Sequence, residues 1–306
     1  MSKKILFMGT PDYATEIFKE LLNSKYEIIG LFTQPDKPVG RKQILTPPSI
    51  KQYCIDENIN FPIFQPLKLR NNDEAVKQIK ELKPDFIIVA AYGQILPKEI
   101  LDIAPCINLH ASLLPKYRGA SPIQESLLND DIYTGVTSML MEEGLDSGDI
   151  LGLQYLKITS TMEVSEAFEK LSLIAAKLTI ITLDNFENIN PMKQNEAEVS
   201  FCKKIKKEDG LVNFIDAKKL YLKYKAYSFW PGVFLESELK LKDIELNDEK
   251  SINNQGQILE INSDFIIVGC EKGSLKIKTL QAPSKKAMNA IDYIRGQRLE
   301  INSILI

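Results

Sequence analysis

The sequence predicts an α/β protein in which a doubly wound, mostly parallel, Rossmann-like sheet is followed by a smaller C-terminal β-barrel of the oligonucleotide-binding (OB) type. Short apolar runs alternate with amphipathic segments in the N-terminal half, and short β-like segments separated by turn residues fill the C-terminal third. At about 150 residues per domain, a chain of 306 residues favours two domains. We expect a first domain at 1–189, a polar linker at 190–206 and the barrel at 207–306.

The first strand–helix–strand unit lies at the N-terminus. Residues 4–8 form a continuously apolar run, which is typical of a strand buried on both faces. Gly9 and Pro11 end that run, and residues 14–22 then place apolar side chains at helical spacing. A second strand is predicted at 27–33.

The same alternation continues further along the chain. Residues 73–82 form an amphipathic helix that ends before Pro84, because the residue preceding a proline disfavours helical backbone. Buried strands are predicted at 85–90 and 106–109. Repeated β-α-β units of this kind predict a parallel sheet.

Other segments fit less regular parts of the fold. Residues 33–49 contain four prolines and are predicted to form a long irregular loop, a length usually found where a loop is functional. Residues 134–158 alternate like antiparallel strands at a sheet edge, and 163–186 indicate a long helix. In the C-terminal part, 265–268 and 274–280 are β-like.

Composition excludes several classes of protein. The chain is 44% hydrophobic and 26% charged, which is ordinary for a globular protein. No apolar run reaches the roughly 20 residues of a membrane span, and the apolar start is too short for a signal peptide, so we expect a cytoplasmic protein. The single histidine and the absence of any CxxC pair disfavour a metal site and a disulfide framework.

Charge is distributed unevenly along the chain. The net charge is −3, yet residues 200–306 carry 18 Lys and Arg side chains against 14 Asp and Glu. A basic C-terminal part on an acidic protein is compatible either with a polyanionic partner or simply with a solvated surface.

The turn after the first strand does not match a dinucleotide site. That fingerprint needs three glycines, whereas residues 9–14 contain one, and no acidic residue stands at the tip of the second strand, which ends Phe32-Thr33-Gln34. A tight strand-to-helix turn is the better interpretation, and an oxidoreductase is disfavoured.

A polar pair lies at the end of the strand predicted at 106–109. Asn108 and His110 are two residues apart, so an extended backbone points both to one face. The carboxyl ends of parallel strands are where open α/β sheets bind ligands, and burying both groups without use would be costly. A purely structural histidine is the alternative.

An acidic and glycine-rich segment lies further along the chain, at Gly144-Leu-Asp-Ser-Gly-Asp149. Such a segment often forms only a turn. In the functional interpretation, Asp146 meets His110 in space and sets its tautomer or accepts a proton. Spacing along the chain does not establish that contact.

Together these residues resemble a known family. The chain is similar, along nearly its whole length, to the methionyl-tRNA formyltransferases, which belong to the formyltetrahydrofolate-dependent transferases. The shared segments are Met8-Gly-Thr-Pro-Asp12, Gln34-Pro-Asp-Lys-Pro-Val-Gly-Arg41, Ala91-Tyr-Gly-Gln-Ile-Leu-Pro97, Ile107-Asn-Leu-His-Ala-Ser-Leu-Leu-Pro-Lys-Tyr-Arg-Gly-Ala-Ser-Pro-Ile123, Gly144-Leu-Asp-Ser-Gly-Asp149, Phe229-Trp-Pro-Gly232 and Gln281-Ala-Pro-Ser-Lys-Lys-Ala-Met288.

The resemblance implies an activity and a catalytic set. Enzymes of this family move a formyl group from 10-formyltetrahydrofolate to the α-amine of methionine on initiator tRNA, for translation initiation. By this resemblance, Asn108 and His110 contact the formyl oxygen and Asp146 manages the proton. We also expect a monomer that needs no metal.

The resemblance also implies binding residues. Ser112, Leu113, Leu114 and Pro115 would line the folate site, and Ala91, Tyr92 and Gly93 would form a wall for the pterin. Lys37, Arg41 and Lys42 would enter the tRNA acceptor end, and the basic C-terminal domain would hold the tRNA body through its phosphates. The family's usual Gly-Arg-Gly-Lys-Lys is Gly40-Arg-Lys-Gln-Ile44 here, with one cation and one glycine fewer.

Other functions share parts of this pattern. A sugar-nucleotide N-formyltransferase uses the same catalytic core and can carry a second domain. A glycinamide ribonucleotide transformylase is about one domain long, and a formyltetrahydrofolate hydrolase usually begins with a regulatory domain. A non-catalytic RNA-binding module would keep the basic C-terminal part, but would have no use for Asn108, His110 and Asp146 together.

Overall fold

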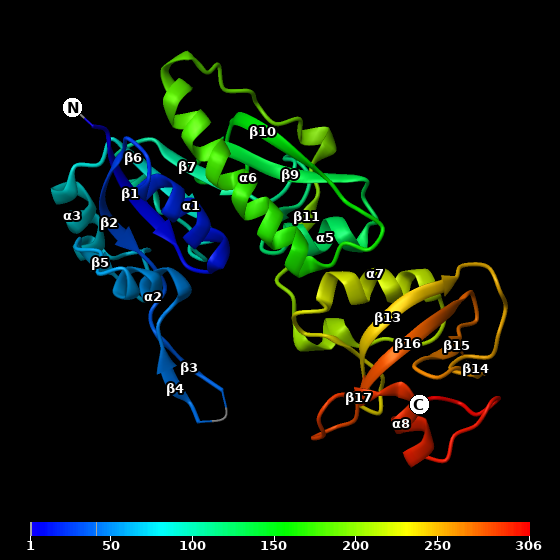
Figure 1. The fold of residues 1–306 in the computed structure, drawn as a ribbon. Coiled ribbons are helices and arrows are strands. Elements are labelled where there is room, and N and C mark those ends of the chain that lie inside the picture. The colour runs from blue at the N-terminus through cyan, green and yellow to red at the C-terminus, as the bar shows by residue number, and fades with distance from the viewer. Residues whose placement is uncertain (1, 41) are drawn as a thin grey trace. The chain divides into compact units, whose positions relative to one another are not determined.

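The computed structural model describes residues 2–40 and 42–306, so Arg41, predicted to contact tRNA, lies outside the described residues. The chain forms two compact units (Figure 1). The first comprises residues 1–122, 133–157 and 168–203, and the second comprises residues 123–132, 158–167 and 204–306. In the described part of the chain, no helix has both the length and the apolar character to cross a membrane.

The first unit is built on a seven-stranded sheet in the order β10-β9-β7-β6-β1-β2-β5. The five strands from β7 to β5 are parallel, whereas β9 and β10 add an antiparallel edge. This confirms the predicted mostly parallel sheet with antiparallel strands at its edge. The strands are β1 (Lys4–Gly9), β2 (Glu27–Phe32), β5 (Ile63–Phe64), β6 (Phe86–Ala90), β7 (Cys106–His110), β9 (Tyr133–Leu140) and β10 (Ile150–Lys157).

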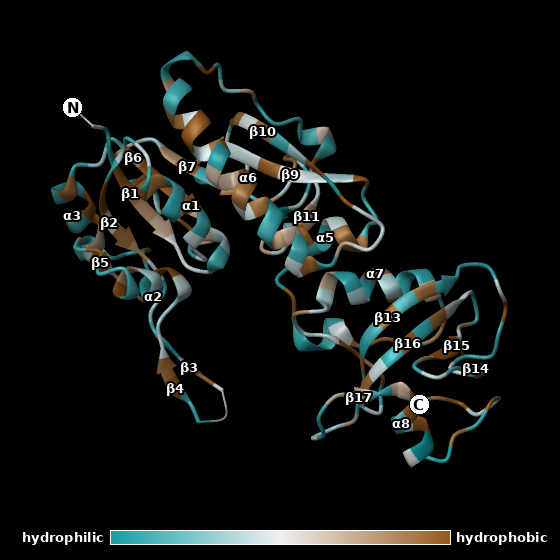
Figure 2. Ribbon diagram, in the orientation of Figure 1, coloured by the Kyte–Doolittle hydropathy of each residue, from teal (hydrophilic) through white to brown (hydrophobic). Residues whose placement is uncertain are grey.

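Helices cover both faces of this sheet because β1 is apolar on both sides. Leu6 and Met8 join a buried cluster with Ile79 of α3, while the Phe7 ring lies 5.3 Å from that of Phe18 on α1. Successive side chains of a strand point to opposite faces, so these contacts place α1 and α3 on different faces. Figure 2 shows β1 and β2 as hydrophobic segments. The helices of this unit are α1 (Asp12–Leu22), α2 (Ser49–Asp56), α3 (Asp73–Leu82), α4 (Lys98–Leu101) and most of α6 (Val164–Asn185), whereas α5 (Pro122–Leu128) belongs almost entirely to the second unit.

The segment predicted as an irregular loop contains a two-stranded ribbon. Strands β3 (Lys37–Val39) and β4 (Ile44–Thr46) pair antiparallel, and the Gln43 amide donates to the Gly40 carbonyl at 3.2 Å. The prediction treated prolines as strand breakers. A ribbon of two strands tolerates Pro38, because each strand has one side without a ladder partner. In Figure 1 the ribbon extends away from the sheet of its unit.

The second unit is an antiparallel β domain, as predicted for the C-terminal part. Its strands run in the order β12-β13-β16-β15-β14, and β17 pairs with β16. Helices α7 (Ala217–Tyr227) and α8 (Ala290–Gly296) contribute Leu220 and Ile294 to its buried core. The strands are β12 (Val233–Phe234), β13 (Lys240–Asp248), β14 (Ile258–Ile261), β15 (Ile266–Gly269), β16 (Ser274–Gln281) and β17 (Met288–Asn289).

The polar stretch after α6 has more structure than the sequence suggested. It contains the short 3-10 helices η1 (Phe186–Asn188) and η2 (Glu196–Glu198), and the strand β11 (Phe201–Cys202). Strand β11 pairs in parallel with β8 (Arg118–Gly119). Residues up to 203 are therefore attached to the first unit.

Candidate active site

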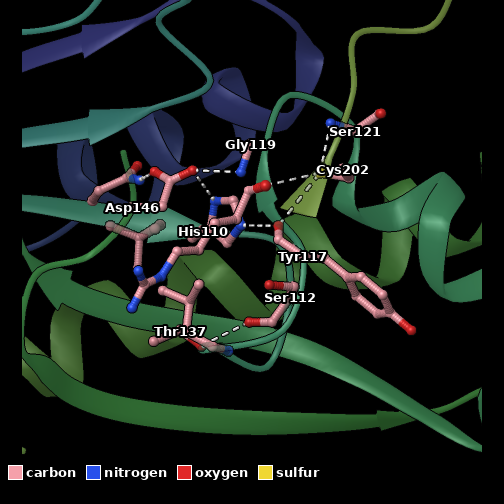
Figure 3. A network of polar contacts seen from close by, with 12 residues as sticks. His110, Ser112, Tyr117, Gly119, Ser121, Thr137, Asp146 and Cys202 are labelled. Atoms are coloured by element: carbon pink, nitrogen blue, oxygen red, sulfur yellow. Dashed lines mark hydrogen bonds and ion pairs between the residues drawn. The ribbon is translucent and has the colours of Figure 1, made fainter. Parts of the chain in front are cut away.

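Three polar side chains meet beyond the carboxyl end of β7. Asn108 and His110 project from this strand, which lies between β6 and β9. Asp146 comes from the loop between β9 and β10. Its Oδ1 lies 3.4 Å from Asn108 Nδ2, and its Oδ2 lies 3.7 Å from His110 Nδ1 (Figure 3). The structure thus brings together the residues that the sequence singled out, in a largely buried environment.

Backbone groups hold the Asp146 carboxylate in place. The Gly119 amide donates to Oδ2 at 2.8 Å and Asn108 Nδ2 lies 3.4 Å from Oδ1, so this carboxylate faces two donors. Asp146 itself adopts a φ of 49°, which aspartate tolerates better than most residues. Two residues later, a Cβ on Gly148 would collide with the Leu140 carbonyl. The glycine is therefore required for the loop to return to the sheet so closely.

The hydrogen bonds of His110 define its tautomer. Its Nε2 lies 2.9 Å from the Tyr117 carbonyl oxygen, which can only accept, so Nε2 carries a hydrogen. In the neutral ring, Nδ1 then presents a lone pair to Asp146. Nδ1 donates to the carboxylate only when the ring is protonated, which makes an ion pair of His110 and Asp146.

A strained turn supports both catalytic partners. Tyr117 has a φ of 61°, unusual for a bulky residue, and Gly119 has a φ of 123°. A Cβ at Gly119 would collide with the Cys202 carbonyl. Ser200 holds the turn, since its Oγ accepts from the Tyr117 amide at 2.9 Å and its carbonyl accepts from the Arg118 amide at 2.9 Å.

The segment predicted to line the folate site follows β7 directly. Thr137 of β9 fixes it, because its Oγ1 donates to the Ser112 carbonyl at 2.7 Å and accepts from the Leu114 amide at 3.0 Å. Ser112 Oγ donates to the Lys116 carbonyl at 2.6 Å. Leu113 and Pro115 are half-buried, and the Leu114–Pro115 peptide is cis.

The second predicted wall follows β6, the neighbouring strand. Ala91 is exposed with a φ of 45°, and Gly93 has a φ of 81°. The Tyr92 carbonyl accepts from Thr10 Oγ1 at 3.2 Å and Gln34 Nε2 at 3.1 Å. The Tyr92 ring lies in the core, and burial raises the pKa of its hydroxyl. The backbone of this segment, rather than the tyrosine ring, is available to a ligand.

The predicted tRNA contacts lie apart from this centre. Lys37 and Lys42 are exposed on the β3–β4 ribbon, together with the apolar side chains of Val39, Ile44 and Leu45. Among residues 2–40 and 42–306, no group of three His, Cys, Asp or Glu side chains is arranged to hold a metal ion.

Several supporting residues escaped the sequence analysis. Gly119, Thr137, Ser200 and Gln194 have no periodic pattern that would distinguish them. A partial signal existed for Gly119, which falls within the segment 107–123 that carries the family resemblance.

Known proteins share both units of the chain. The formyl transferase family model matches residues 3–181, and the model for the formyl transferase C-terminal domain matches 204–298. The methionyl-tRNA formyltransferase of a Nitratiruptor species is 56% identical over 298 residues, covering 97% of this chain and 98% of that protein. The methionyl-tRNA formyltransferase of Campylobacter jejuni (strain RM1221) is 53% identical over 300 residues, covering 97% and 98%.

Solved structures share the fold at much lower identity. The N-formyltransferase from Helicobacter canadensis, in complex with folinic acid and dTDP-3-aminofucose, superposes with a TM-score of 0.68 at 16% identity, covering 91% of this chain and 99% of that one. HypX from Aquifex aeolicus in complex with tetrahydrofolic acid gives 0.65 at 16% identity, covering 96% of this chain and about half (47%) of that one. The formyltransferase with the bound amino-sugar nucleotide is thus only a distant structural neighbour of this chain. On its full-length similarity at more than half identity, the chain belongs to the methionyl-tRNA formyltransferase family.

Proposed function

We propose that the protein transfers the formyl group of 10-formyltetrahydrofolate to the α-amino group of methionine on initiator tRNA, for translation initiation. The observation that carries this proposal is the convergence of Asn108, His110 and Asp146 beside the end of β7. Full-length similarity to methionyl-tRNA formyltransferases supports the choice of acceptor. We also propose that the protein acts as a monomer in the cytoplasm.

Formyl transfer between two nitrogens needs donors for a developing oxyanion. A neutral amine attacks the formyl carbon, and negative charge accumulates on the formyl oxygen. When this intermediate collapses, the bond between the formyl carbon and N10 of the folate breaks, and tetrahydrofolate leaves. Each preorganised donor to such an oxygen contributes about 3 kcal/mol in comparable sites. The Asn108 amide has two hydrogens, so one can donate to Asp146 and the other to the formyl oxygen.

His110 and Asp146 divide the remaining work between them. The Asp146 carboxylate lies 3.7 Å from His110 Nδ1 and orients the ring, so that a proton accepted there makes an ion pair and places positive charge next to the developing oxyanion. The attacking amine becomes positively charged and must lose a proton. Neutral His110, next to the Asp146 carboxylate, accepts this proton as the tetrahedral intermediate forms, and the proton then passes to the leaving nitrogen of the folate. Both ring nitrogens already face protein oxygens, so a direct hydrogen bond from His110 to the formyl oxygen requires one of these contacts to open.

The folate co-substrate fits the two segments that flank the catalytic residues. Ala91, Tyr92 and Gly93 follow β6, while Ser112, Leu113, Leu114 and Pro115 follow the adjacent β7. The exposed, left-handed backbone at Ala91 and the half-buried Leu113 and Pro115 offer polar backbone groups beside apolar surface. Such a lining suits a flat heterocycle with hydrogen-bonding edges.

We assign the tRNA to the exposed ribbon and to the C-terminal domain. Lys37 and Lys42 present cations on the ribbon, and Arg41 belongs to the same proposed contact. In this division, residues 1–189 carry out the chemistry, 190–206 connect the domains and 207–306 hold the tRNA body through phosphates.

The decisive experiment measures transfer of radiolabelled formyl from 10-formyltetrahydrofolate to two acceptors, charged initiator tRNA and a dTDP-amino sugar. We expect label in methionyl-tRNA and none in the sugar nucleotide. If only the sugar nucleotide were labelled, the acceptor would be an amino sugar, and the proposed acceptor, methionyl-tRNA, would be wrong. Titration with the folate alone separates an enzyme from a non-catalytic RNA-binding module, which would bind no folate.

A further inference from the structure

We propose that Arg118 and Gln194 are positioning residues, which set the geometry of Asp146 from a segment outside the catalytic strands. This inference rests on the proposed formyl transfer. It deepens that proposal by giving the stretch after α6 a part in the active site.

Gln194 fastens the Asp146 loop from behind. Its Nε2 donates to the Asp146 carbonyl at 2.8 Å and to the Gly148 carbonyl at 2.8 Å. Both amide hydrogens are therefore used to hold the backbone on either side of Ser147. The side chain is buried, at 8% exposure, so water cannot replace these contacts at little cost.

Arg118 fixes Gln194 in turn. Its Nε donates to Gln194 Oε1 at 3.0 Å, and its Nη2 donates to Glu196 Oε1 at 2.8 Å. The Arg118 residue is 4% exposed, and a cation this deeply buried persists only when it is paired and hydrogen-bonded. All polar atoms of the Gln194 amide thus have partners, which allows it a single orientation.

Arg118 is also connected to Asp146 through the backbone of its neighbour in sequence. Arg118 immediately precedes Gly119, whose amide donates to Asp146 Oδ2. The Arg118 amide is bonded to Ser200 in the segment that also carries Gln194. Gln194 therefore holds the backbone of Asp146, and the Gly119 amide holds its carboxylate oxygen. Arg118 connects these two supports.

Positioning matters at Asp146 because its contacts to the catalytic pair are at their outer range. The 3.7 Å separation from His110 and the 3.4 Å separation from Asn108 leave little room for displacement. A shift of about 1 Å in a catalytic group can cost on the order of a hundredfold in rate. Substrate binding, in contrast, does not depend on these atoms in the proposed function.

The test replaces Gln194 by methionine, which keeps its volume and removes its hydrogen bonds. We expect kcat for formyl transfer to fall about 10- to 100-fold, while KM for the folate and for methionyl-tRNA changes less than about 2-fold. Gln78→Met is the control, because Gln78 also makes a side-chain hydrogen bond, to Glu74, but on α3, outside the proposed active site and the surfaces assigned to tRNA. We expect it to retain wild-type kcat.

The background of Asp146→Asn separates positioning from general structural damage. In the Asp146→Asn background, Gln194→Met should lower the single-turnover rate of formyl transfer, measured with excess enzyme, by less than about 2-fold. An equal loss on both backgrounds, or a rise in KM that accounts for the loss, would overturn the proposal. Arg118→Lys should act on the same step, and combining it with Gln194→Met should give less than the product of the two losses.

Hydrogen exchange at Gly119 gives a readout that needs no activity. If Asp146 moves, the Gly119 amide loses its acceptor, so its exchange should accelerate at least about 10-fold in Gln194→Met but not in Gln78→Met. Unchanged exchange would contradict the positioning role. If the wild-type protein transfers no formyl group, the proposed function fails, whereas faster exchange at Gly119 would still show that Gln194 holds Asp146.

Discussion

The catalytic centre and the β3–β4 ribbon are built in opposite ways. Around Asp146, buried side chains and backbone amides from four separate stretches of sequence fix one another. On the ribbon, Lys37, Val39 and Ile44 are exposed, and the strands pair only with each other among the described residues. The contrast fits the proposed function, in which the chemistry needs a fixed geometry and the proposed contact with tRNA needs an accessible surface.

The ribbon nevertheless has a defined base. Lys51 Nζ lies 2.8 Å from Asp36 Oδ2, and Gln65 Nε2 donates to Asp36 Oδ1 at 2.7 Å. These hydrogen bonds, first from Gln65 and then from Lys51, lower the pKa of the Asp36 carboxyl group. The ribbon is thus anchored where it leaves the sheet.

We call the buried network around Asp146, with Asn108, His110 and Gly119, the rigid region. The largest effect should come from replacing His110 in this region. We expect His110→Ala to reduce kcat on the order of a thousandfold, because a charged group beside the oxyanion acts mainly in the transition state. Folate affinity, measured by equilibrium titration, should stay within about 2-fold of wild type. A variant with normal turnover would remove His110 from the mechanism.

A smaller effect, of a different kind, should come from the exposed region. The double variant Lys37→Gln/Lys42→Gln should raise KM for methionyl-tRNA about 10-fold and leave kcat unchanged, because the two cations neutralise phosphates without touching the reaction. The slope of log KM against log salt should become shallower by roughly one to two.

Lys77→Gln together with Lys80→Gln provides a charge-matched control, because both lysines are exposed on α3, outside the surfaces assigned to tRNA. If the ribbon variant and this control weaken tRNA use equally, the contact belongs to overall charge and not to the ribbon.

The sequence predicted the strands that carry the rigid region better than it predicted the contacts between side chains there. Apolar periodicity is local, so β1, β6 and β7 were correctly predicted from their own residues. The pairing of Asn108 with His110 followed from their spacing on one strand. Their contact with Asp146 did not, since residues 108 and 146 are joined only by the folded sheet.

Two features lay beyond local reasoning for different reasons. The ribbon was wrongly predicted to be irregular, because Pro38 counts against a strand unless the strand is known to lie at an edge. Gln194 was assigned to a linker, because a polar stretch shows no sign of which polar groups it will meet. Its importance depends on three backbone or side-chain partners distant in the sequence.

The anchor of the ribbon should show a modest dependence of stability on pH. Asp36→Asn is expected to lower the free energy of unfolding by about 0.5–1 kcal/mol at pH 7, the usual range for a partly exposed ion pair. The folded state lowers the pKa of Asp36, so its stabilisation is present above the unfolded pKa of about 3.9 and is lost as pH falls through the lower folded value.

Urea unfolding of both proteins between pH 7 and pH 3 checks this sign. The gap between wild type and Asp36→Asn should narrow toward acid pH. A gap that widens there would mean that the carboxylate is destabilising in the folded state.

The smallest expected effect sharpens the comparison at the tip of the ribbon. Ile44→Thr keeps a β-branched side chain and removes an exposed apolar one, since Ile44 is 62% exposed. Exposed positions rarely change the free energy of unfolding by more than about 0.5 kcal/mol, so the urea midpoint should not move measurably. The same variant should weaken methionyl-tRNA use if the apolar tip packs against the nucleic acid. A large loss of stability would instead show that the tip is packed within the protein, and the ribbon would then belong to the rigid region.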